Sequence, residues 1–314
     1  MATYLITGGA GFIGSNLARH ILDQGEDVVV LDNFATGKRE NLAGIADRIT
    51  LIEGDIRVRE DVDRAVSGCA AVFHQAALGS VPRSMDDPQT SHEVNVNGTV
   101  NVLEASRSAG VQRVVFAASS SAYGDQKESP KHEGMVPLPI SPYAAGKVSC
   151  ESYMRAYAAG FGMETVCLRY FNVFGPRQDP AGAYAAVIPA FVSRLLRDEQ
   201  PVVYGDGEQS RDFCYVENVC EANWLAAHAP AASCSGAVVN IACGERISLN
   251  QILDLLRTML GRDMAADYQP PRAGDVKHSL ADISRAAETI GYKPRIFFED
   301  GLRKAIDWYR ENLS

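Results

Sequence analysis

The segment Thr3-Tyr4-Leu5-Ile6-Thr7-Gly8-Gly9-Ala10-Gly11-Phe12-Ile13-Gly14 decides the fold. Its apolar start predicts a strand over Tyr4–Thr7, and the pattern after the glycines predicts a helix over Phe12–Gln24. Glycines in the turn between them permit close approach of the backbone to a pyrophosphate, and the helix amino terminus supplies free N–H groups and a positive dipole end. A Gly-x-Gly-x-x-Gly pattern in this strand–turn–helix context therefore predicts a dinucleotide site.

The end of the second predicted strand, Asp27–Leu31, indicates which dinucleotide would bind. Asp32 follows it and can accept hydrogen bonds from ribose hydroxyls, while its charge repels a 2′-phosphate, so NAD is favoured over NADP. Lys38 and Arg39 lie downstream and would soften this preference if they faced the ribose, but a solvated loop is the simpler interpretation. Gly54-Asp55-Ile56 follows the third predicted strand and is placed to reach the adenine; a plain turn is the equal alternative.

The first half of the chain alternates short apolar runs with helical patterns. This alternation predicts βαβ units, a parallel sheet and right-handed crossovers. The runs are apolar and β-branched throughout, as expected of strands covered by helices on both faces. The predicted strands are Tyr4–Thr7, Asp27–Leu31, Thr50–Glu53, Ala71–His74, Arg113–Ala118 and Glu164–Tyr170, and the predicted helices are Phe12–Gln24, Arg59–Val66, Asp87–Ala109 and Pro142–Phe161.

The pattern changes after Asn172, where prolines and glycines cluster and the alternation breaks. A returning strand is predicted over Val238–Ala242, and helices over Ser248–Leu260, Ile283–Ile290 and Gly301–Glu311. We therefore expect an α/β fold: a Rossmann-type, doubly wound parallel sheet with a smaller, interleaved carboxyl-terminal α/β lobe that binds substrate. The expected NAD-binding domain is residues 1–172 plus about 214–242, and the expected substrate lobe is residues 173–213 and 243–314.

Composition excludes several classes of protein. The 314 residues are 46% hydrophobic and 22% charged, which is ordinary for a globular protein with room for two lobes. A net charge of -9 argues against nucleic acid as a partner. No basic leader and no uncharged apolar run of about 18 residues is present, so we expect a cytoplasmic protein without a membrane partner. The 7 cysteines form no Cys-x-x-Cys pair, which indicates reduced thiols and no metal site.

Two downstream segments carry the candidate chemistry. Tyr143-Ala144-Ala145-Gly146-Lys147 places a phenol and an ammonium one helical turn apart, on one face. A free tyrosine, with a pKa of about 10, is a poor base at neutral pH, and a nearby lysine favours the phenolate. The pattern alone is common, since an exposed aromatic beside a solvated lysine also produces it. Ala117-Ala118-Ser119-Ser120-Ser121-Ala122-Tyr123-Gly124 ends the fifth predicted strand, at the edge where open α/β sheets bind ligands.

A nucleotide turn, a strand-end serine and a helical Tyr-x-x-x-Lys together resemble the extended short-chain dehydrogenase/reductase family. The resemblance implies that Ser119 hydrogen-bonds the reacting sugar oxygen, that Tyr143 is the acid/base, and that Lys147 holds the nicotinamide ribose and favours the tyrosinate. It implies a second substrate contact at Ser121 and no role for Ser120. The implied cofactor contacts are Gly8, Gly11, Phe12, Ile13, Gly14, Asp32, Asn33, Asp55, Ile56, Ala76, Tyr143, Lys147 and Tyr170.

The residues before Tyr123 narrow the reaction. Relatives that dehydrate nucleotide sugars carry an Asp-Glu pair at this place, and the similar decarboxylases carry a Glu two residues before the tyrosine. This chain has Ser121 and Ala122 there, so loss of water or CO2 is disfavoured. Inversion at a sugar carbon needs only the serine, the tyrosine, the lysine and an NAD that is tightly bound and not consumed.

The second half of the chain resembles the nucleotide-sugar 4-epimerases, most closely the bacterial enzymes acting on N-acetylated UDP-hexoses. The resemblance covers essentially the whole chain and is carried by the segments 169–178, 183–189, 205–207, 210–213 and 272–276. It implies that Asn172 and a helix starting at Ala186-Val187 face the UDP phosphates, and that Tyr204 packs at the uracil. Arg211 and Arg272 are implied to contact phosphate, Asp275 the uridine ribose, and Gly79 and Ser80 the sugar. The full set of implied substrate contacts is Gly79, Ser80, Ser121, Asn172, Gln178, Ala186, Val187, Tyr204, Arg211, Arg272, Asp275 and Ser279.

Ser279 falls where this family sets the width of the sugar pocket. A small residue leaves room for a 2-acetamido group, although it can equally be a small packing residue. The expected function is therefore NAD-dependent 4-epimerisation of UDP-hexoses, UDP-GlcNAc and UDP-GalNAc first and UDP-Glc and UDP-Gal second, in polysaccharide biosynthesis. The alternatives are a UDP-glucuronate 4-epimerase, a decarboxylase, or a catalytically silent NAD-binding regulator. The predicted helices Asp87–Ala109 and Pro142–Phe161 resemble those of a four-helix dimer interface, which implies a homodimer.

Overall fold

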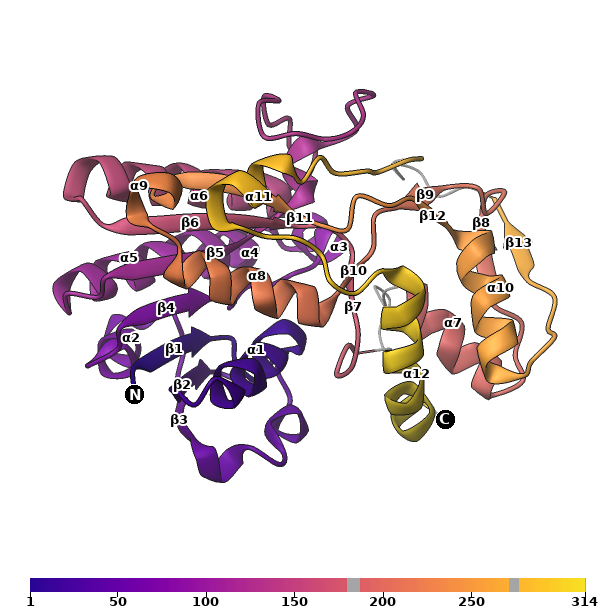
Figure 1. The fold of residues 1–314 in the computed structure, drawn as a ribbon, viewed down its shortest axis with the longest axis horizontal. Helices are drawn as coiled ribbons and strands as arrows, with labels where there is room; N and C mark the ends of the chain where they lie inside the picture. Colours follow the sequence, from indigo (N-terminus) through magenta and orange to yellow (C-terminus); the bar gives the residue numbers. More distant parts are fainter. Residues whose placement is uncertain (180–186, 271–276, 314) are drawn as a thin grey trace.

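A seven-stranded parallel sheet forms the centre of the protein (Figure 1). The computed structural model describes residues 1–179, 187–270 and 277–313. The strand order β11-β6-β5-β4-β1-β2-β3 is that of a doubly wound Rossmann sheet extended by one strand, so the predicted fold class is confirmed. The strands are β1 Thr3–Thr7, β2 Asp27–Asp32, β3 Ile49–Glu53, β4 Ala71–His74, β5 Arg113–Ser119, β6 Glu164–Tyr170 and β11 Ala237–Ile241.

Helices cover both faces of this sheet, because alternate strand side chains point to opposite sides. On β1, Tyr4 and Ile6 join one hydrophobic core and Leu5 joins the other. The first core is closed by α1 and α8, which pack against each other, and the second by α2, α5 and α6. These helices are α1 Phe12–Asp23, α2 Arg59–Val66, α5 Gly98–Ser108, α6 Pro142–Phe161 and α8 Val216–His228.

The long helix predicted over Asp87–Ala109 differs from the structure. It consists of α4 (Pro88–His92), a π-helical turn and α5. Within the π-turn, Asn95 faces inward: its Oδ1 accepts a hydrogen bond from the Leu78 N–H at 2.8 Å, and its Nδ2 donates to the Leu78 carbonyl at 3.3 Å. Irregular turns of this kind often occur at functional sites. Here the turn fastens the segment that follows β4.

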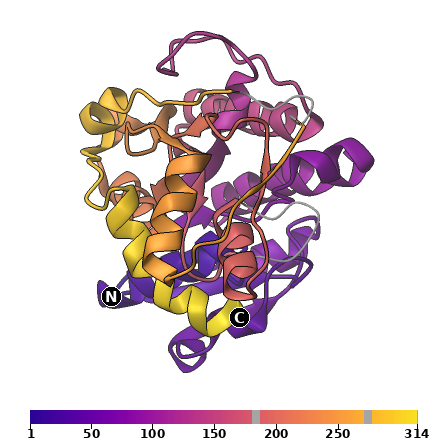
Figure 2. The same ribbon diagram turned by 90° about the vertical axis from the view of Figure 1, so that its right-hand side faces the viewer.

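A smaller lobe lies at one end of the sheet, and Figure 2 views it face-on. Its helices α7, α10 and α12 pack against one another beside the parallel pair of β8 and β13. The predicted helices here begin and end within a few residues of the observed ones, whereas α8 has no counterpart among them. The elements are β7 Val173–Phe174, α7 Val187–Leu196, β8 Val202–Tyr204, β9 Ser210–Arg211, β10 Cys214–Tyr215, β12 Ile247–Ser248, α10 Leu249–Leu260, β13 Asp267–Gln269 and α12 Phe298–Leu313. The helix α11 Ser284–Ile290 packs instead against β11 of the central sheet.

A helix that crosses a lipid bilayer needs about 20 predominantly apolar residues. No helix in the described part of the chain is long and apolar enough to cross a membrane.

Candidate active site

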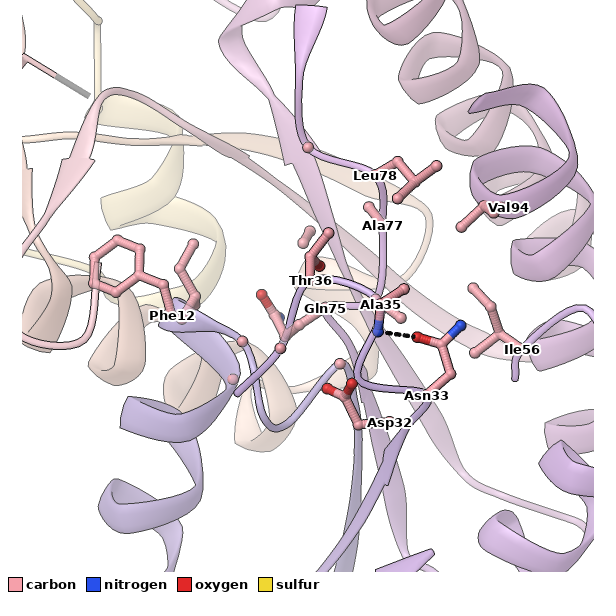
Figure 3. Close-up of a pocket in the computed structure, with 18 of the residues that line it drawn as sticks. Phe12, Asp32, Asn33, Ala35, Thr36, Ile56, Gln75, Ala77, Leu78 and Val94 are labelled. Atoms are coloured by element: carbon pink, nitrogen blue, oxygen red, sulfur yellow. Dashed lines mark hydrogen bonds between the residues drawn. The ribbon is translucent and has the colours of Figure 1, made fainter. Parts of the chain in front are cut away.

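A cavity of about 590 Å³ opens at the carboxyl ends of the strands, where the strand order reverses between β1 and β4 (Figure 3). Ligands of open α/β sheets bind at this switch point. All the residues predicted to contact the cofactor line the cavity, together with two of those predicted to contact the sugar. They are Gly8, Gly11, Phe12, Ile13, Gly14, Asp32, Asn33, Asp55, Ile56, Ala76, Tyr143, Lys147 and Tyr170, and the sugar residues Gly79 and Ser80.

The Gly-rich turn is built so tightly that side chains would not fit. Gly8 has a φ of +70°, and a Cβ there would lie 2.7 Å from the backbone of Ala76. A Cβ on Gly14 would lie 2.2 Å from the carbonyl oxygen of Gly8. Among the described residues no side chain caps α1 at Gly11, so the first N–H groups of the helix are available to a ligand. The turn therefore fits a pyrophosphate, as an NAD site requires.

Asp32 ties this turn to the end of β2. Its Oδ2 accepts a hydrogen bond from the Ala10 N–H at 2.8 Å, and its Oδ1 accepts one from the Phe34 N–H at 2.8 Å. Burial raises the pKa of this carboxyl group, against the effect of the two backbone hydrogen bonds. Each carboxylate oxygen keeps further acceptor capacity, so Asp32 can also accept from ribose hydroxyls.

The two cations that would have softened the preference for NAD are both engaged by carboxylates. Lys38 Nζ lies 3.1 Å from Asp179, and both residues line the cavity. Arg39 pairs with Glu53, and its guanidinium lies 4.0 Å from the centroid of the Phe34 ring. Since each cation is paired with a carboxylate, the geometry agrees with the sequence in favouring NAD over NADP.

The far end of the cavity suits an adenine. Asn33 donates to Asp55 Oδ2 at 2.9 Å and accepts from the Ala35 N–H at 3.0 Å, the contact drawn in Figure 3. Hydrogen bonds from Arg57 lower the pKa of Asp55 to about 2, so this carboxylate is ionised at neutral pH. Ile56 lies next to them and supplies an apolar wall.

Tyr143 and Lys147 lie together on the cavity wall formed by α6. Lys147 is buried; its Nζ donates to the Ala117 carbonyl at 2.7 Å and lies 5.8 Å from the centroid of the Tyr143 ring. The Tyr143 N–H donates to Ser84 Oγ at 3.0 Å, which fixes the start of α6. The one-turn spacing seen in the sequence thus becomes a pair at a cavity rather than a solvated surface pair.

Ser119 and Ser121 are joined by two hydrogen bonds. Ser121 donates to Ser119 Oγ twice, from its hydroxyl at 2.9 Å and from its N–H at 3.2 Å. Because Ser119 Oγ accepts both, its own hydrogen is free to be donated to a substrate oxygen. Ser119 is the last residue of β5, next to Ala117 and Ala118, which line the cavity.

His74 is a buried residue that the sequence showed only as the end of a strand. Its Nε2 lies 2.9 Å from Thr99 Oγ1 and its Nδ1 lies 2.7 Å from Thr7 Oγ1. Thr99 already donates its hydroxyl hydrogen to the Asn95 carbonyl at 2.6 Å, so it must accept from His74. His74 therefore carries its proton on Nε2 and accepts from Thr7. Burial, followed by the charge of Lys147, lowers its pKa to about 3.

The turns after β2 and β4 contribute further lining residues that were not predicted. Thr36, Gln75 and Leu78 are examples (Figure 3). Gln75 also donates to the hydroxyl of Tyr170 at 3.1 Å. Their position directly after parallel strands was a signal available in the sequence, because such turns form the carboxyl edge of the sheet.

Ser121 lies in the turn after β5 and does not line this cavity. The other described residues predicted to contact substrate do not line it either. They are distributed over the smaller lobe and the turns that lead to it, where Ser279 donates its N–H to the Ser210 carbonyl at 3.0 Å and Gln178 donates to the Val173 carbonyl at 3.0 Å. Asn172, Val187, Tyr204 and Arg211 also lie there, whereas Ala186, Arg272 and Asp275 lie outside the described residues.

Asp212 ties several of these segments together. Its buried carboxylate accepts the N–H groups of Cys243 at 2.9 Å, Gly244 at 3.0 Å and Ala281 at 3.1 Å. Its carbonyl accepts from the side chain of Asn172 at 3.0 Å. Burial raises the pKa of Asp212 to about 6, although the N–H donors oppose this shift. No sequence argument had singled out this residue.

Comparison with known proteins identifies what the whole chain is similar to. The sequence model of the NAD dependent epimerase/dehydratase family matches residues 4–242. A UDP-glucose 4-epimerase of Mycolicibacterium smegmatis is 37% identical over 315 residues, covering 98% of both chains. A UDP-N-acetylglucosamine 4-epimerase of Methanobrevibacter ruminantium, solved with UDP-N-acetylmuramic acid, has a TM-score of 0.94 at 39% identity, covering 99% of this chain and 98% of its own. A UDP-glucose 4-epimerase of Thermus thermophilus, solved with NAD, has a TM-score of 0.88 at 37% identity, covering 99% of each.

Proposed function

The chain belongs to the NAD-dependent epimerase/dehydratase family, and from this we propose that it inverts C4 of a UDP-hexose, with UDP-GlcNAc and UDP-GalNAc as its preferred pair. It is a nucleotide-sugar 4-epimerase that uses NAD. The observation that carries the proposal is the convergence of Tyr143 and Lys147 on a cavity beside the uncapped start of α1, with Ser119 directly after the lining residues Ala117 and Ala118.

The side chains can be assigned roles in this reaction. The residues that line the cavity would hold NAD, which would supply a reversible hydride acceptor for C4. Tyr143 takes the proton from O4 and later gives it back, which is general base and then general acid catalysis. Ser119 donates its free hydroxyl hydrogen to O4 and orients it, while Ser121 holds Ser119 in place. The ammonium of Lys147, fixed on the Ala117 carbonyl, stabilises the negative charge of the tyrosinate.

Anchoring of the nucleotide away from the reacting carbon supports inversion. We propose that Asn172, Gln178, Val187, Tyr204 and Arg211, with the predicted contacts outside the described residues, bind UDP. Binding energy from these remote groups holds the 4-keto sugar while its hexose ring turns between the two half-reactions. In this proposal residues 1–172 with about 214–242 hold NAD and the remaining segments hold the nucleotide sugar.

The preference for N-acetylated sugars rests on Ser279. Its hydroxymethyl group is small, and its backbone is held by Ser210, so the position offers room without shifting the loop. A structural neighbour that is a UDP-N-acetylglucosamine 4-epimerase supports this choice. The relative from Mycolicibacterium smegmatis is a UDP-glucose 4-epimerase, and therefore UDP-Glc and UDP-Gal are the second candidate pair.

Dehydration and decarboxylation need a carboxylate in the turn after β5, whereas epimerisation does not. A dehydratase or decarboxylase of this family places a carboxylate before Tyr123, whereas Ser121 and Ala122 stand there. A silent NAD-binding regulator would not require Ser119, Tyr143 and Lys147 together. These residues favour epimerisation over both.

A panel of UDP-sugars tests the proposal. UDP-Glc, UDP-GlcNAc, UDP-GlcA and their C4 epimers are each incubated with the holoenzyme, and the products are identified by NMR. We expect UDP-GlcNAc and UDP-GalNAc to interconvert fastest, without release of NADH or CO2. Tyr143→Phe should abolish turnover, and Tyr153→Phe, which removes only the hydroxyl of a tyrosine of the same helix that does not line the cavity, is the matched control. Turnover by Tyr143→Phe at the wild-type rate would contradict the mechanism.

We also propose a homodimer through α6 and the α4–α5 segment. Tyr153 and Phe161 are large side chains on α6 with exposed fractions of 42% and 59%, which a partner subunit would cover. Light scattering at working concentration should report twice the mass of the 33.9 kDa chain, and a monomer would contradict this arrangement.

A further inference from the structure

Arg177 occupies a strained position at the edge of the cavity. It follows Gly175 and Pro176 and has a φ of +69°, a left-handed conformation that is uncommon for a residue with a side chain. Strain of this kind is kept where the surrounding structure demands it and often marks a functional site. Here the loop is fastened to α1, because Asn16 Nδ2 donates to the Pro176 carbonyl at 3.0 Å and Asn16 Oδ1 accepts from the Arg177 guanidinium.

The guanidinium of Arg177 is incompletely paired. Its Nε is buried and has no hydrogen-bond partner among residues 1–179, 187–270 and 277–313, and no carboxylate in these ranges forms an ion pair with it. Burial, followed by the positive charge of Arg19, lowers its pKa to about 10. A half-buried cation with a buried, unfilled donor is costly unless an anion joins it.

Two neighbouring cations at this edge of the cavity are already engaged. Arg19 donates to the carbonyl oxygens of Ser15 at 2.9 Å, Asn41 at 2.8 Å and Ala43 at 2.6 Å. Lys38 is paired with the carboxylate of Asp179. Of these three cations, Arg177 is the one that both lines the cavity and has no carboxylate paired with it among the described residues.

The ligand chemistry follows from what else faces the same space. Arg177 lines the cavity together with Gly11, Phe12 and Ile13, which form the uncapped first turn of α1 (Phe12 is labelled in Figure 3). Helix amino termini and arginine forks both prefer phosphate oxygens, one through N–H groups and the dipole, the other through charge-assisted hydrogen bonds. A neutral or cationic ligand would leave both unsatisfied.

We propose that Arg177 binds the pyrophosphate of NAD opposite the amino terminus of α1, and that this contact retains the cofactor between turnovers. The inference rests on the proposed use of NAD but not on the identity of the sugar. An epimerase that returns the hydride to its own substrate must keep NAD through the cycle. Arg177 lies in the loop after β7, far in sequence from the Gly-rich turn, and its guanidinium donates a hydrogen bond to Asn16 of α1. Through this contact the loop after β7 would help to retain NAD.

Displacement of labelled NAD from the holoenzyme tests this proposal. Adenosine and ADP-ribose share the adenine and ribose contacts, but only ADP-ribose carries the pyrophosphate. In the wild type, ADP-ribose should displace NAD at a far lower concentration than adenosine does. The quantity to compare is the adenosine concentration that displaces half of the NAD, divided by the ADP-ribose concentration that does so. Arg177→Gln should reduce this ratio by about 10- to 100-fold, the effect of one charge-assisted hydrogen-bonded contact. It should also lower the NAD retained per chain after gel filtration.

Two further variants keep the test decisive. Arg39→Gln removes a charge from an arginine that is already paired with Glu53, and it should leave the ratio at the wild-type value. Arg177→Lys keeps the cation without the fork and should reduce the ratio by a smaller factor, which also serves if Arg177→Gln fails to fold. An unchanged ratio in the Arg177 variants would overturn the proposal, even if NAD binding as a whole became weaker, since a structural role would weaken both ligands equally.

Discussion

His74 makes the stability of the protein depend on pH in a direction that can be calculated. In the folded chain its pKa is about 3, because it is buried and faces Lys147, whereas an ordinary histidine has a pKa of about 6.5. Below about pH 6.5 the unfolded chain binds a proton that the folded chain refuses, so the stability that His74 contributes is present above pH 6.5 and is lost as the pH falls towards 3. The loss is about 1.4 kcal/mol per pH unit, or about 2 kcal/mol at pH 5.

Urea unfolding at pH 7 and pH 5 measures this loss. Other buried groups act as well: Asp212, with its raised pKa, contributes stability that is lost as the pH rises through about 6. The quantity to compare between variants is therefore the change in the free energy of unfolding from pH 7 to pH 5. His74→Gln keeps a donor and an acceptor but does not titrate, and it should lose about 2 kcal/mol less than the wild type between the two pH values. His92→Gln, at an exposed histidine, is the matched control and should keep the wild-type difference. Equal differences for His74→Gln and the wild type would refute the reasoning.

Three substitutions probe other parts of the site. Gly14→Ala would place a Cβ 2.2 Å from the Gly8 carbonyl oxygen, so bound NAD, measured by its absorbance after gel filtration, should fall below half of the wild-type content. Asp212→Ala removes the acceptor for three N–H groups and should raise KM for the UDP-sugar about 10-fold while NAD content stays constant; an unchanged KM would oppose the positioning role. Ser279→Tyr should lower kcat/KM for UDP-GlcNAc about 100-fold and spare UDP-Glc, and equal losses for both sugars would contradict the pocket assignment.

Much of the fold was predictable because it depends on local patterns. The apolar runs and the Gly-rich turn predicted six parallel strands to within a residue or two. Strands buried on both faces must be apolar throughout, and all six are buried in this way except the edge strand β3. The helix α8 was not predicted, because it lies in the half of the chain where the alternation of strands and helices breaks. The π-turn around Asn95 was not predicted either; Asn95 is hydrogen-bonded to Leu78, a contact that no local pattern records.

In the candidate site, too, the residues that follow a local sequence pattern were predictable, and those that depend on tertiary contacts were not. Tyr143, Lys147 and the glycines carry spacings that chemistry requires, so the amino-acid sequence alone is enough to select them. Arg177 and His74 could not be selected in this way, because an arginine after a Gly-Pro turn and a histidine at a strand end have no distinguishing neighbours in sequence. Their importance depends on burial and on partners that only the tertiary fold brings together.

The central claim is that the C4 hydrogen leaves as hydride and returns to the same carbon, while Tyr143 moves only the O4 proton. The direct measurement uses the UDP-hexose that is most active in the panel, deuterated at C4 and incubated with the holoenzyme in ordinary water. The account predicts that NMR of the epimerised product shows deuterium retained at C4, with no net NADH formed. A product that carries hydrogen from water at C4, or NADH in stoichiometric amount, would contradict it.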